Sequence, residues 1–544
     1  MRVTAKQEIA ALRYLGQLAE EHATPKAADS GEPYKLARRT RLNENWMPTN
    51  VAGDSATAQS IELSNARVRE EARNNPHFVK TTGVYTDLVI GCGVQAYSDP
   101  FAIGMDFDDD RLDFELNYAV ESDEWFQRWA DDPKQCDAAG KQSWWEMQRT
   151  SFGEMPDVGD SILMRCNKKG PNRLVSICYQ QIEREQLDRT MDRQASPGKN
   201  KIVNGIELDT FNEPVAYWIF DEHPDDSQYS RGLSKSTRIP AERIIHAFIP
   251  FRPSMNVGFS WYHAMAQNSR DRHWVMGGYL TKVAMDSLMT LVHYSPNGSS
   301  AVNLEGEDST GTDGRPEVRM VQGGHVCTLS TQDKVEMFNS GNTPPQQLPA
   351  FIDVLDHDGA AAVQLSHLRY TGRWSNLSYV AGRGAQLDDE MHCKPLRRFW
   401  GGTVVLPVRQ AVNEQLVARG RIRSITARDL MANPFEYNNF MTVGPGREML
   451  DPEGESDSAK SKLGAGLSTL QIELGKLGLH WVKVLRQIRL ENKIMQKFGI
   501  TLDFSKGGGQ QLGSRVAGES SVERKERESK EARARQIVAE VLAG

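Results

Sequence analysis

The chain has 544 residues and is too long for a single hydrophobic core, so two to four domains or subdomains are expected. Hydrophobic residues make up 39% and charged residues 25% of the chain, which is ordinary for a globular protein. The sequence contains no run of eighteen apolar residues, so no membrane-spanning helix is predicted. The formal net charge of −7 argues against a protein that coats itself in nucleic acid, although it leaves room for a local basic patch.

The N-terminal sequence is too polar for the apolar core of a signal peptide, so the chain is expected to stay in the compartment where it is made. No CxxC pair is present, and the cysteine spacings indicate neither a disulfide framework nor a zinc cluster. We therefore interpret the six cysteines as reduced, mostly buried thiols: Cys92, Cys136, Cys166, Cys178, Cys327 and Cys393.

The first 60 residues are polar and predict a peripheral arm with one short helix and a basic cluster at Lys35–Arg41. A helical pattern then runs from Asn65 to Ile90, where Gly91 and Gly93 end it. A second helical block covers Glu121–Phe152. It contains Trp125, Phe126, Trp129, Trp144 and Trp145, which are typical of core packing, and Asp131-Asp-Pro133 interrupts it.

A run of strands is predicted next. Ser161–Cys166 and Leu174–Gln180 flank the turn Lys168–Asn172, which predicts a β-hairpin. Further strand candidates are Ile206–Asp209, Pro214–Phe220 and Ile244–Ile249.

Helical periodicity returns over Tyr262–Tyr294. Residues 295–316 are polar and rich in Gly, Ser, Asp and Glu, which predicts a mobile excursion. Short strands are predicted after it, at Val318–Val321, His325–Leu329 and Val335–Phe338.

A helix over residues 346–368 is followed by the segment Arg369–Gly384, which carries three arginines, a tryptophan and three glycines. Beyond it, an apolar residue recurs every four positions from Leu396 to Leu416, which predicts a long helix. Pro395, Gly401-Gly402 and Pro407 lie inside that stripe and predict a kink. Residues 505–544 read as a flexible linker and a solvated, charged C-terminal helix.

Motifs for catalysis are missing. Cys136–Lys141 lacks the upstream glycine of a phosphate loop, Gly258–Tyr262 is not a GxSxG elbow, and no HExxH occurs. The acidic clusters Asp106–Asp110 and Asp388–Glu390 could bind a cation, but they are more typical of solvated charge or of a helix start. No catalytic residue, metal site or cofactor is therefore expected.

Several short motifs occur together in a familiar order. Glu71–Val79 (EARNNPHFV) with Gly91–Val94 resembles phage portal proteins of the lambda type, which carry an "R-NNP" helix before an apolar helix that ends in a glycine pair. Similar in the same order are Trp129–Asp137, Gly159–Leu163, Gly205–Asp209 with Pro214–Trp218, Ile239–His246 with Arg252-Pro253 and Gly258–Trp261, Thr371–Ala385, Gly446–Pro452 and Gly466–Thr469. The resemblance covers residues 60 to 500. Val380 and Ala381 depart from it, because small polar residues are usual there.

The resemblance implies an α+β portal fold with a mixed α/β wing, a helical stem, a small α/β clip and a helical crown, built into a ring. Mapped onto this chain, the regions are an N-terminal arm (1–60), wing (61–258), stem helix (259–294), clip and adjoining strands (295–345), second stem helix (346–368), tunnel loop (369–383), kinked wing helix (384–420), wing and crown (421–504), and flexible linker with charged C-terminal helix (505–544).

The function implied is a ring, usually of twelve copies, at one capsid vertex of the virion, assembled in the host cytoplasm. Double-stranded DNA is packaged and ejected through its centre without sequence-specific contact. The implied partners are the large terminase subunit, the head–tail connector or adaptor, and the major capsid and scaffolding proteins, with no membrane. The alternatives are another virion structural protein, of the tail or capsid, or a metal-dependent nuclease that uses the acidic clusters.

The tunnel loop is the candidate site. A ring of twelve chains, each of charge −7, would carry about −84 and repel phosphate, so a sparse ring of cations could position DNA without holding it. The DNA-facing candidates are Arg369, Arg373, Trp374, Asn376 and Arg383. The arginines could instead pair with Asp388, Asp389 or Glu390 of an adjacent subunit, and both arrangements could hold together.

Overall fold

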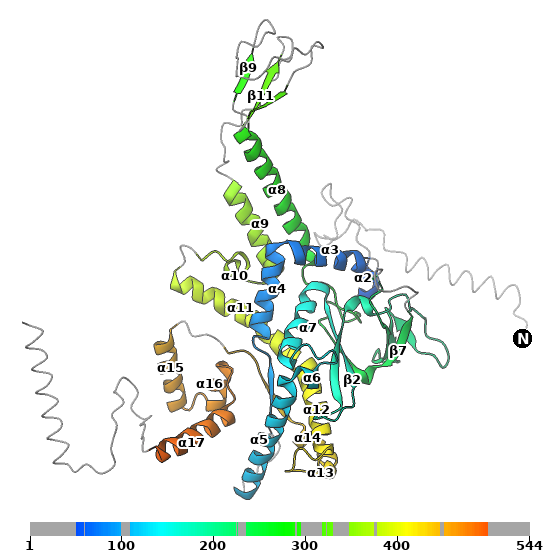
Figure 1. Cartoon of the computed structure of the whole chain (residues 1–544), viewed down its shortest axis with the longest axis vertical. Helices are drawn as coiled ribbons and strands as arrows, with labels where there is room; N and C mark the ends of the chain where they lie inside the picture. The colour runs from blue at the N-terminus through cyan, green and yellow to red at the C-terminus, as the bar shows by residue number, and fades with distance from the viewer. Residues whose placement is uncertain are drawn as a thin grey trace, which may run out of the picture. The chain divides into compact units, whose positions relative to one another are not determined.

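A computed structural model describes residues 50–58, 60–99, 109–224, 226, 235–288, 291–294, 318–321, 324–329, 348–374, 378–446 and 451–498. The chain divides into two units, Met1–Ala52 and Gly53–Gly544, and the elements below belong to the second (Figure 1). Most of the predicted arm, the excursion 295–316, the strand Val335–Phe338 and the C-terminal segment 505–544 lie outside the described residues.

The first helices form where the asparagine–proline motif predicted them. After α2 (Gly53–Ala58), α3 (Ile61–Asn74) and α4 (Pro76–Val89) meet at Asn75. The Asn75 side chain accepts a hydrogen bond from the backbone N–H of His77 and caps α4, whose first residue is a proline. Its Nδ2 also donates to Ser269 Oγ at 2.7 Å, so this cap ties α4 to a helix nearly 200 residues further along the chain.

The aromatic helical block packs into the core, as predicted. It consists of α5 (Asp109–Asp131), α6 (Pro133–Cys136) and α7 (Trp144–Val158), and the break falls at Asp132, which caps α6. Trp129 and Trp144 are fully buried with their ring centroids 6.1 Å apart, and Phe152 meets Trp400 edge to face at 5.4 Å. Tyr179 of the adjoining sheet completes this core.

Two antiparallel sheets follow the helices. The predicted hairpin is confirmed as β2 (Asp160–Asn167) and β3 (Ile177–Ile182), with Cys166 opposite Cys178, and β8 (Ile244–Phe248) flanks β2 on the other side. The second sheet is a meander of four strands, of which the first and the last were not predicted from the sequence: β4 (Lys201–Val203), β5 (Ile206–Leu208), β6 (Pro214–Phe220) and β7 (Ser236–Pro240). A smaller hydrophobic cluster lies between the two sheets.

Two further sheets join distant parts of the chain. β1 (Gln95–Ser98) pairs with β12 (Phe440–Val443), which brings the C-terminal third back to the first helices. β9 (Leu291–Tyr294) runs parallel to β11 (Gly324–Leu329), and β10 (Val318–Val321) lies antiparallel to β11. The mixed helix-and-sheet class is therefore confirmed, together with the strands predicted at 318–321 and 325–329.

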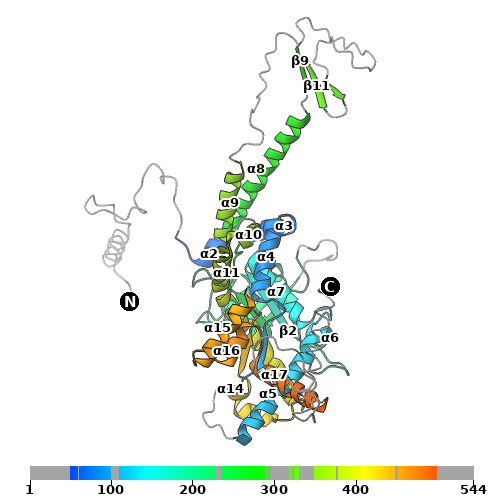
Figure 2. The ribbon, with the colours of Figure 1, turned by 90° about the vertical axis from the view of Figure 1, so that its left-hand side faces the viewer.

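A pair of helices leads to and from the β9–β11 region. α8 (His263–Leu288) and α9 (Leu348–Ala362) lie side by side in both ribbon views (Figures 1 and 2). The prediction of one helix over 346–368 is wrong, because α9 ends at Ala362 and α10 (His367–Thr371) begins separately. Between them Gln364 adopts a left-handed backbone conformation with φ 52°, which no regular helix contains.

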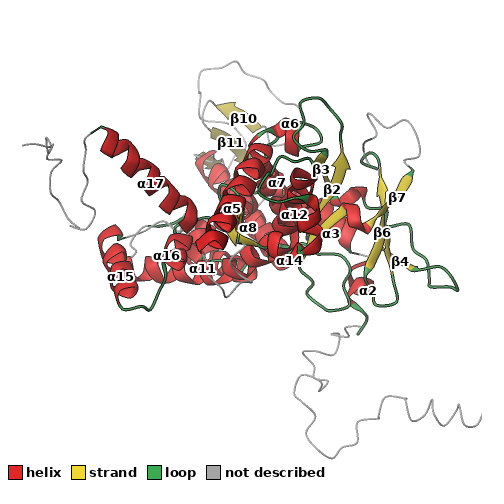
Figure 3. Ribbon diagram, turned by 90° about the horizontal axis from the view of Figure 1, so that it is seen from below, coloured by secondary structure: helices red, strands yellow, loops and turns green. Residues whose placement is uncertain are grey.

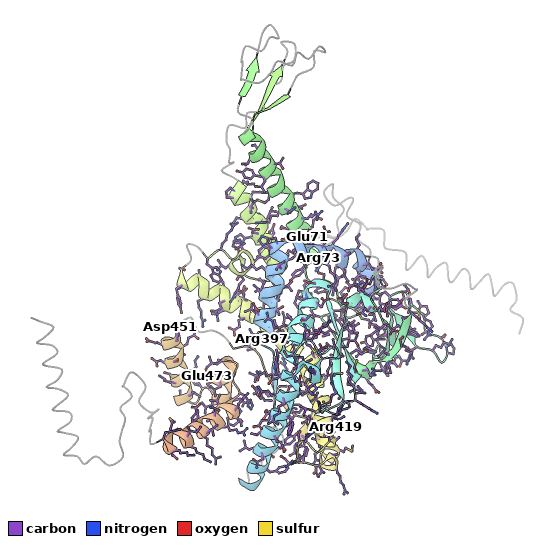
Figure 4. All side chains as sticks on the ribbon, in the orientation of Figure 1. Glu71, Arg73, Arg397, Arg419, Asp451 and Glu473 are labelled. Atoms are coloured by element: carbon purple, nitrogen blue, oxygen red, sulfur yellow. The ribbon has the colours of Figure 1, made fainter. Side chains whose placement is uncertain are left out.

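The long apolar stripe forms α11 (Tyr379–Trp400), a π-helical turn η5 (Gly401–Val405) and α12 (Leu406–Ala418). The backbone N–H of Leu406 donates to the carbonyl of Gly401, five residues back, so the predicted interruption is a wide turn within one continuous helix. Figure 4 labels Arg397 near its middle, where Nε donates to the carbonyl of Leu88 on α4 at 2.7 Å.

Short helices complete the described chain, and Figure 3 shows them from below together with the sheets. They are α13 (Ala427–Ala432), α14 (Pro434–Tyr437), α15 (Pro452–Gly464), α16 (Leu470–Lys476) and α17 (Trp481–Lys497), with 3₁₀ turns at Arg184–Gln186 and Ala241–Arg243. His480, just before α17, stacks on Tyr97 of β1 at 4.3 Å and joins the C-terminal helices to the rest.

Candidate functional site

The candidate tunnel loop is shorter than predicted. Arg369 belongs to α10, and Arg383 lies in the first turns of α11, so the connection between the helices runs only from Gly372 to Ser378. Both ends are capped: Gly372 ends α10 with φ 74°, and the Ser378 hydroxyl accepts from the backbone N–H of Ala381. Asn376 lies outside the described residues.

Arg369 lies against a buried carboxylate of its own chain. Its Nε is 3.5 Å from Asp389 Oδ2 on α11, and Asp389 is 1% exposed. The same carboxylate accepts hydrogen bonds of 2.7 Å from the backbone N–H and the hydroxyl of Ser366, the residue that caps α10. Asp389 therefore fixes the start of α10 against α11, and Arg369 balances its charge.

Arg373 and Trp374 follow α10 and are the exposed members of the predicted set. The Arg373 side chain is 56% exposed and Trp374 is 54% exposed. The closest described acid to Arg373 is Asp356, at 4.0 Å, and that carboxylate is fully buried and already accepts from Arg272 Nε at 2.6 Å. Arg373 thus keeps much of its guanidinium in solvent, where it could meet an anionic ligand.

The remaining predicted residues lie along α11. Arg383 pairs with Glu455 of α15 at 3.1 Å, so it links α11 to the C-terminal helices rather than extending from the connection. Asp388 is exposed, and Glu390 is half-buried. The acidic run Asp388–Glu390 thus lies inside a helix and not at its start, whereas the other acidic cluster does lead into a helix, since α5 begins at Asp109.

Lys80 is a cation at this junction that the sequence analysis missed. It projects from α4 over Gly372, so closely that a side chain at position 372 would collide with its Nζ. Partial burial, and then the charge of Arg369, lower the pKa of Lys80. Nearly 300 residues separate Lys80 from Arg369, and no spacing in the sequence links them.

Aromatic contacts hold α10 on α4. The ring of Tyr370 stacks on His77 at 4.7 Å, and its hydroxyl packs closely over Gly359 of α9. Burial, followed by the negative charge of Asp356, raises the pKa of Tyr370 to about 12. The Tyr85 hydroxyl donates to the carbonyl of Val363 in the turn between α9 and α10. The junction is therefore a packed platform, and Gly372, at its edge, begins the connection to α11.

A second buried ionic cluster lies at the start of β2, away from this junction. Asp160 at the start of β2 meets Arg184, accepts from the backbone N–H of Gly258 at 2.7 Å and contacts His246 Nε2 at 2.8 Å. Burial opposes ionisation of Asp160, but Arg184 and His246 outweigh it and lower the pKa of Asp160.

Figure 4 labels Arg419, whose guanidinium donates to the carbonyls of Arg173 and Leu174 and holds the end of α12 against the β2–β3 loop.

Comparison with known families decides the identity. Residues 39–397 match the family described as phage portal protein, lambda family, which is well over half of the chain. The chain belongs to that family. It is a portal protein of the phage virion, and among its described helices none has the length and apolar character needed to cross a membrane.

A phage relative of this portal protein agrees with it in name. A protein of Halomonas phage phiHAP-1 named "Probable portal protein" is 23% identical over 477 residues, covering 87% of this chain and 88% of the relative. Among solved structures, a chain from the neck of an empty gene transfer agent particle is 14% identical, with TM-score 0.37, and covers 81% of this chain and 98% of that one. A chain from the virion of the native particle is 13% identical, with TM-score 0.36, and covers 80% and 98%.

Proposed function

We propose that twelve copies of this portal protein form a ring at one capsid vertex and that double-stranded DNA enters and leaves the capsid through the centre of the ring. The observation that carries this proposal is family membership over residues 39–397, a span that contains α8, α9, α10 and most of α11. In this arrangement α8 and α9 are the stem, the β9–β11 sheet belongs to the clip, the two larger sheets belong to the wing, and α15–α17 contribute to the crown.

The connection 372–378 is the part that we assign to the channel lining. It follows two packed helices and contains the exposed Arg373 and Trp374, and Lys80 of α4 lies beside it as a second cation. A single half-solvated arginine per subunit contacts phosphate through its charge and reads no base edges. Since the chain as a whole is acidic, contact at this level would steady the duplex while still letting it slide.

The same ring would serve as the docking platform for the large terminase subunit and the head–tail connector, and would meet the major capsid and scaffolding proteins during assembly in the host cytoplasm. We assign no catalytic step to the chain. The acidic run at Asp388–Glu390 supports this assignment, since the carboxylate of Asp389 is buried and committed to Ser366 and Arg369.

The proposal is tested by imaging the purified full-length chain by negative-stain electron microscopy. We expect rings with a central hole and twelvefold averages. Monomers or dimers only, at the concentrations used for imaging, would refute the ring. Magnesium-dependent cleavage of DNA by the same preparation would refute the assignment of a non-enzymatic role.

A further inference from the structure

A cluster of one carboxylate and two imidazoles lies at the turn between α9 and α10. Asp353 and His357 are one helical turn apart on α9, and His367 is the first residue of α10. The two imidazole rings stack with their centroids 3.8 Å apart and their planes 11° apart. Three side chains of metal-ligating type thus lie together on both sides of the left-handed turn at Gln364, and one imidazole has to turn out of the stack for both Nε2 atoms to face the same ion.

The spacing of the ligand atoms is informative. His357 Nε2 lies 3.6 Å from Asp353 Oδ2, and His367 Nε2 lies 3.5 Å from Asp353 Oδ1. Both separations are too long for a good hydrogen bond. Each is close to the roughly 3.3 Å that separates two donor atoms bound to one tetrahedral zinc ion at bond lengths of about 2.0–2.1 Å, with each histidine facing a different oxygen of Asp353.

The third observation concerns His367 itself. Its Nε2 is buried and has no hydrogen-bond partner, although its imidazole is directed at Asp353. A buried polar atom without a partner loses the hydrogen bond that water would supply, so such atoms are uncommon in folded proteins. A cation held between Nε2 and the carboxylate would satisfy both groups.

We propose that Asp353, His357 and His367 bind one divalent transition-metal ion of the zinc type. Two neutral imidazoles and a carboxylate form a common ligand set for zinc, with a fourth position left to water. The half-exposed Asp353 and the exposed His357 leave a path for the ion from solvent. The site departs from the sequence-based expectation of no metal, and it does not depend on the proposed DNA channel.

The consequence of binding is local. Asp353 and His357 belong to α9, whereas His367 opens α10, so the ion clamps the two helices across the turn at Gln364. Because α10 leads directly into Gly372 and Arg373, metal binding stiffens the segment from which the cationic connection extends.

The test uses the full-length chain, freed of metal with EDTA and dialysed. Titration with Zn²⁺ is followed by calorimetry, and Co²⁺ serves as a spectroscopic probe because its visible bands report a tetrahedral nitrogen and oxygen ligand set. We expect one saturable site per chain. His357→Gln and His367→Gln should each weaken Zn²⁺ binding tenfold or more, and the double variant should lose the site. Amide exchange in residues 363–371 should slow with Zn²⁺ in the unaltered chain only.

The matched control is His273→Gln, which removes an exposed histidine of α8 outside the cluster and should leave Zn²⁺ affinity unchanged. Circular dichroism of each variant without metal establishes that it is folded. Equal Zn²⁺ affinity in the double histidine variant and the unaltered chain would overturn the proposal, and so would the absence of saturable binding in the unaltered chain. A Co²⁺ spectrum of an octahedral, water-bound ion would also contradict it.

Discussion

Arg369 Nε lies 3.5 Å from Asp389 Oδ2 in the same chain, and this contact joins α10 to α11. The sequence left two roles open for the arginines of this segment, contact with DNA or pairing with acids of a neighbouring subunit. Arg369 already has a buried acid of its own chain, and Arg383 has Glu455. Arg373 is therefore the best candidate for contact with DNA, while pairing of Asp388 or Glu390 across subunits stays a prediction.

Replacing Arg373 separates a channel role from a structural one. We expect Arg373→Ala to leave ring assembly intact, because its side chain is 56% exposed and 4.0 Å from Asp356, and to lower the amount of DNA packaged or retained. Arg369→Ala should instead destabilise the fold by about 1–3 kcal/mol, since it leaves Asp389 buried without its cation. DNA content per particle and thermal stability are measured for both, with the exposed Arg428→Ala as control. Unchanged DNA content in Arg373→Ala particles would contradict the channel role.

The Arg272–Asp356 contact clamps α8 to α9. Asp356 is fully buried, and Arg272 Nε donates to it at 2.6 Å. We expect Arg272→Met to lower the free energy of unfolding by about 3 kcal/mol, because an uncompensated carboxylate stays in the interior. Adding Asp356→Leu should recover most of the loss, since both charges are then gone. Urea denaturation of the two single variants and the double variant measures the coupling, and simple additivity would argue against a buried ion pair.

Gly258 lies where two backbones touch. A Cβ at this position would collide with the carbonyl of Gly159, which ends α7 with φ 92°, and no side chain can move to relieve the clash. We expect Gly258→Ala to cost about 3 kcal/mol or more, and the thermal midpoint to fall accordingly. Gly277→Ala on α8 is the matched control: no atom lies within 4 Å of its Cβ, so alanine should be neutral or stabilising by up to about 1 kcal/mol. Equal midpoints for the two variants would disprove the close approach.

Asp157 makes the free energy of unfolding of the chain depend on pH. Burial, opposed by the hydrogen bond from Thr82 Oγ1, raises the pKa of Asp157 to about 6, above the 3.8 of a free aspartate. The folded chain therefore binds a proton at Asp157 more tightly than the unfolded chain does. Its free energy of unfolding rises as the pH falls from about 6 to about 4, and at pH 7.5 the buried, ionised carboxylate lowers that free energy. Asp157→Asn removes that penalty and keeps an acceptor for Thr82, so its thermal midpoint should exceed that of the unaltered chain at pH 7.5.

The difference between the two midpoints should shrink as the pH falls to 4, because the aspartic acid is then protonated in the folded protein. Calorimetry at pH 7.5, 6 and 4 measures it. A constant difference at all three values would show that Asp157 is ionised throughout this range.

Local patterns in the sequence predicted many of the helices and strands. The β2–β3 hairpin, β5, β6 and β8 lie within a few residues of their predicted positions, because alternating β-branched residues and turn residues are local signals. The break at Gln364 was missed because a left-handed backbone position is usually occupied by glycine or asparagine, so glutamine gave no reason to predict one there. The pairing of β1 with β12 joins segments about 340 residues apart, and no local pattern links such strands.

The site was predicted less completely than the fold. An aspartate in the middle of a charged run reads as solvated, so the burial of Asp389 could not be anticipated. Lys80 and His77 reach the junction from α4, and Asp356 reaches it from α9. Their contribution depends on helix packing. Arg373 and Trp374 were singled out because a cationic, aromatic segment between two helices is unusual, and their contact with DNA stays a prediction.

The wide turn at Gly401–Val405 has a consequence for the angular phase of the helix. From Trp400 to Leu416 a regular α-helix of about 100° per residue would place the two side chains about 160° apart, on opposite sides of the axis. Both are fully buried in one core. Because a π turn absorbs about one residue, it reduces the offset to about 60°. The π turn thus rotates the apolar face of α12 by about 100° relative to that of α11, compared with a regular α-helix. Because side chains on both sides of the turn are buried, the helix cannot return to regular α-helical geometry without exposing some of them.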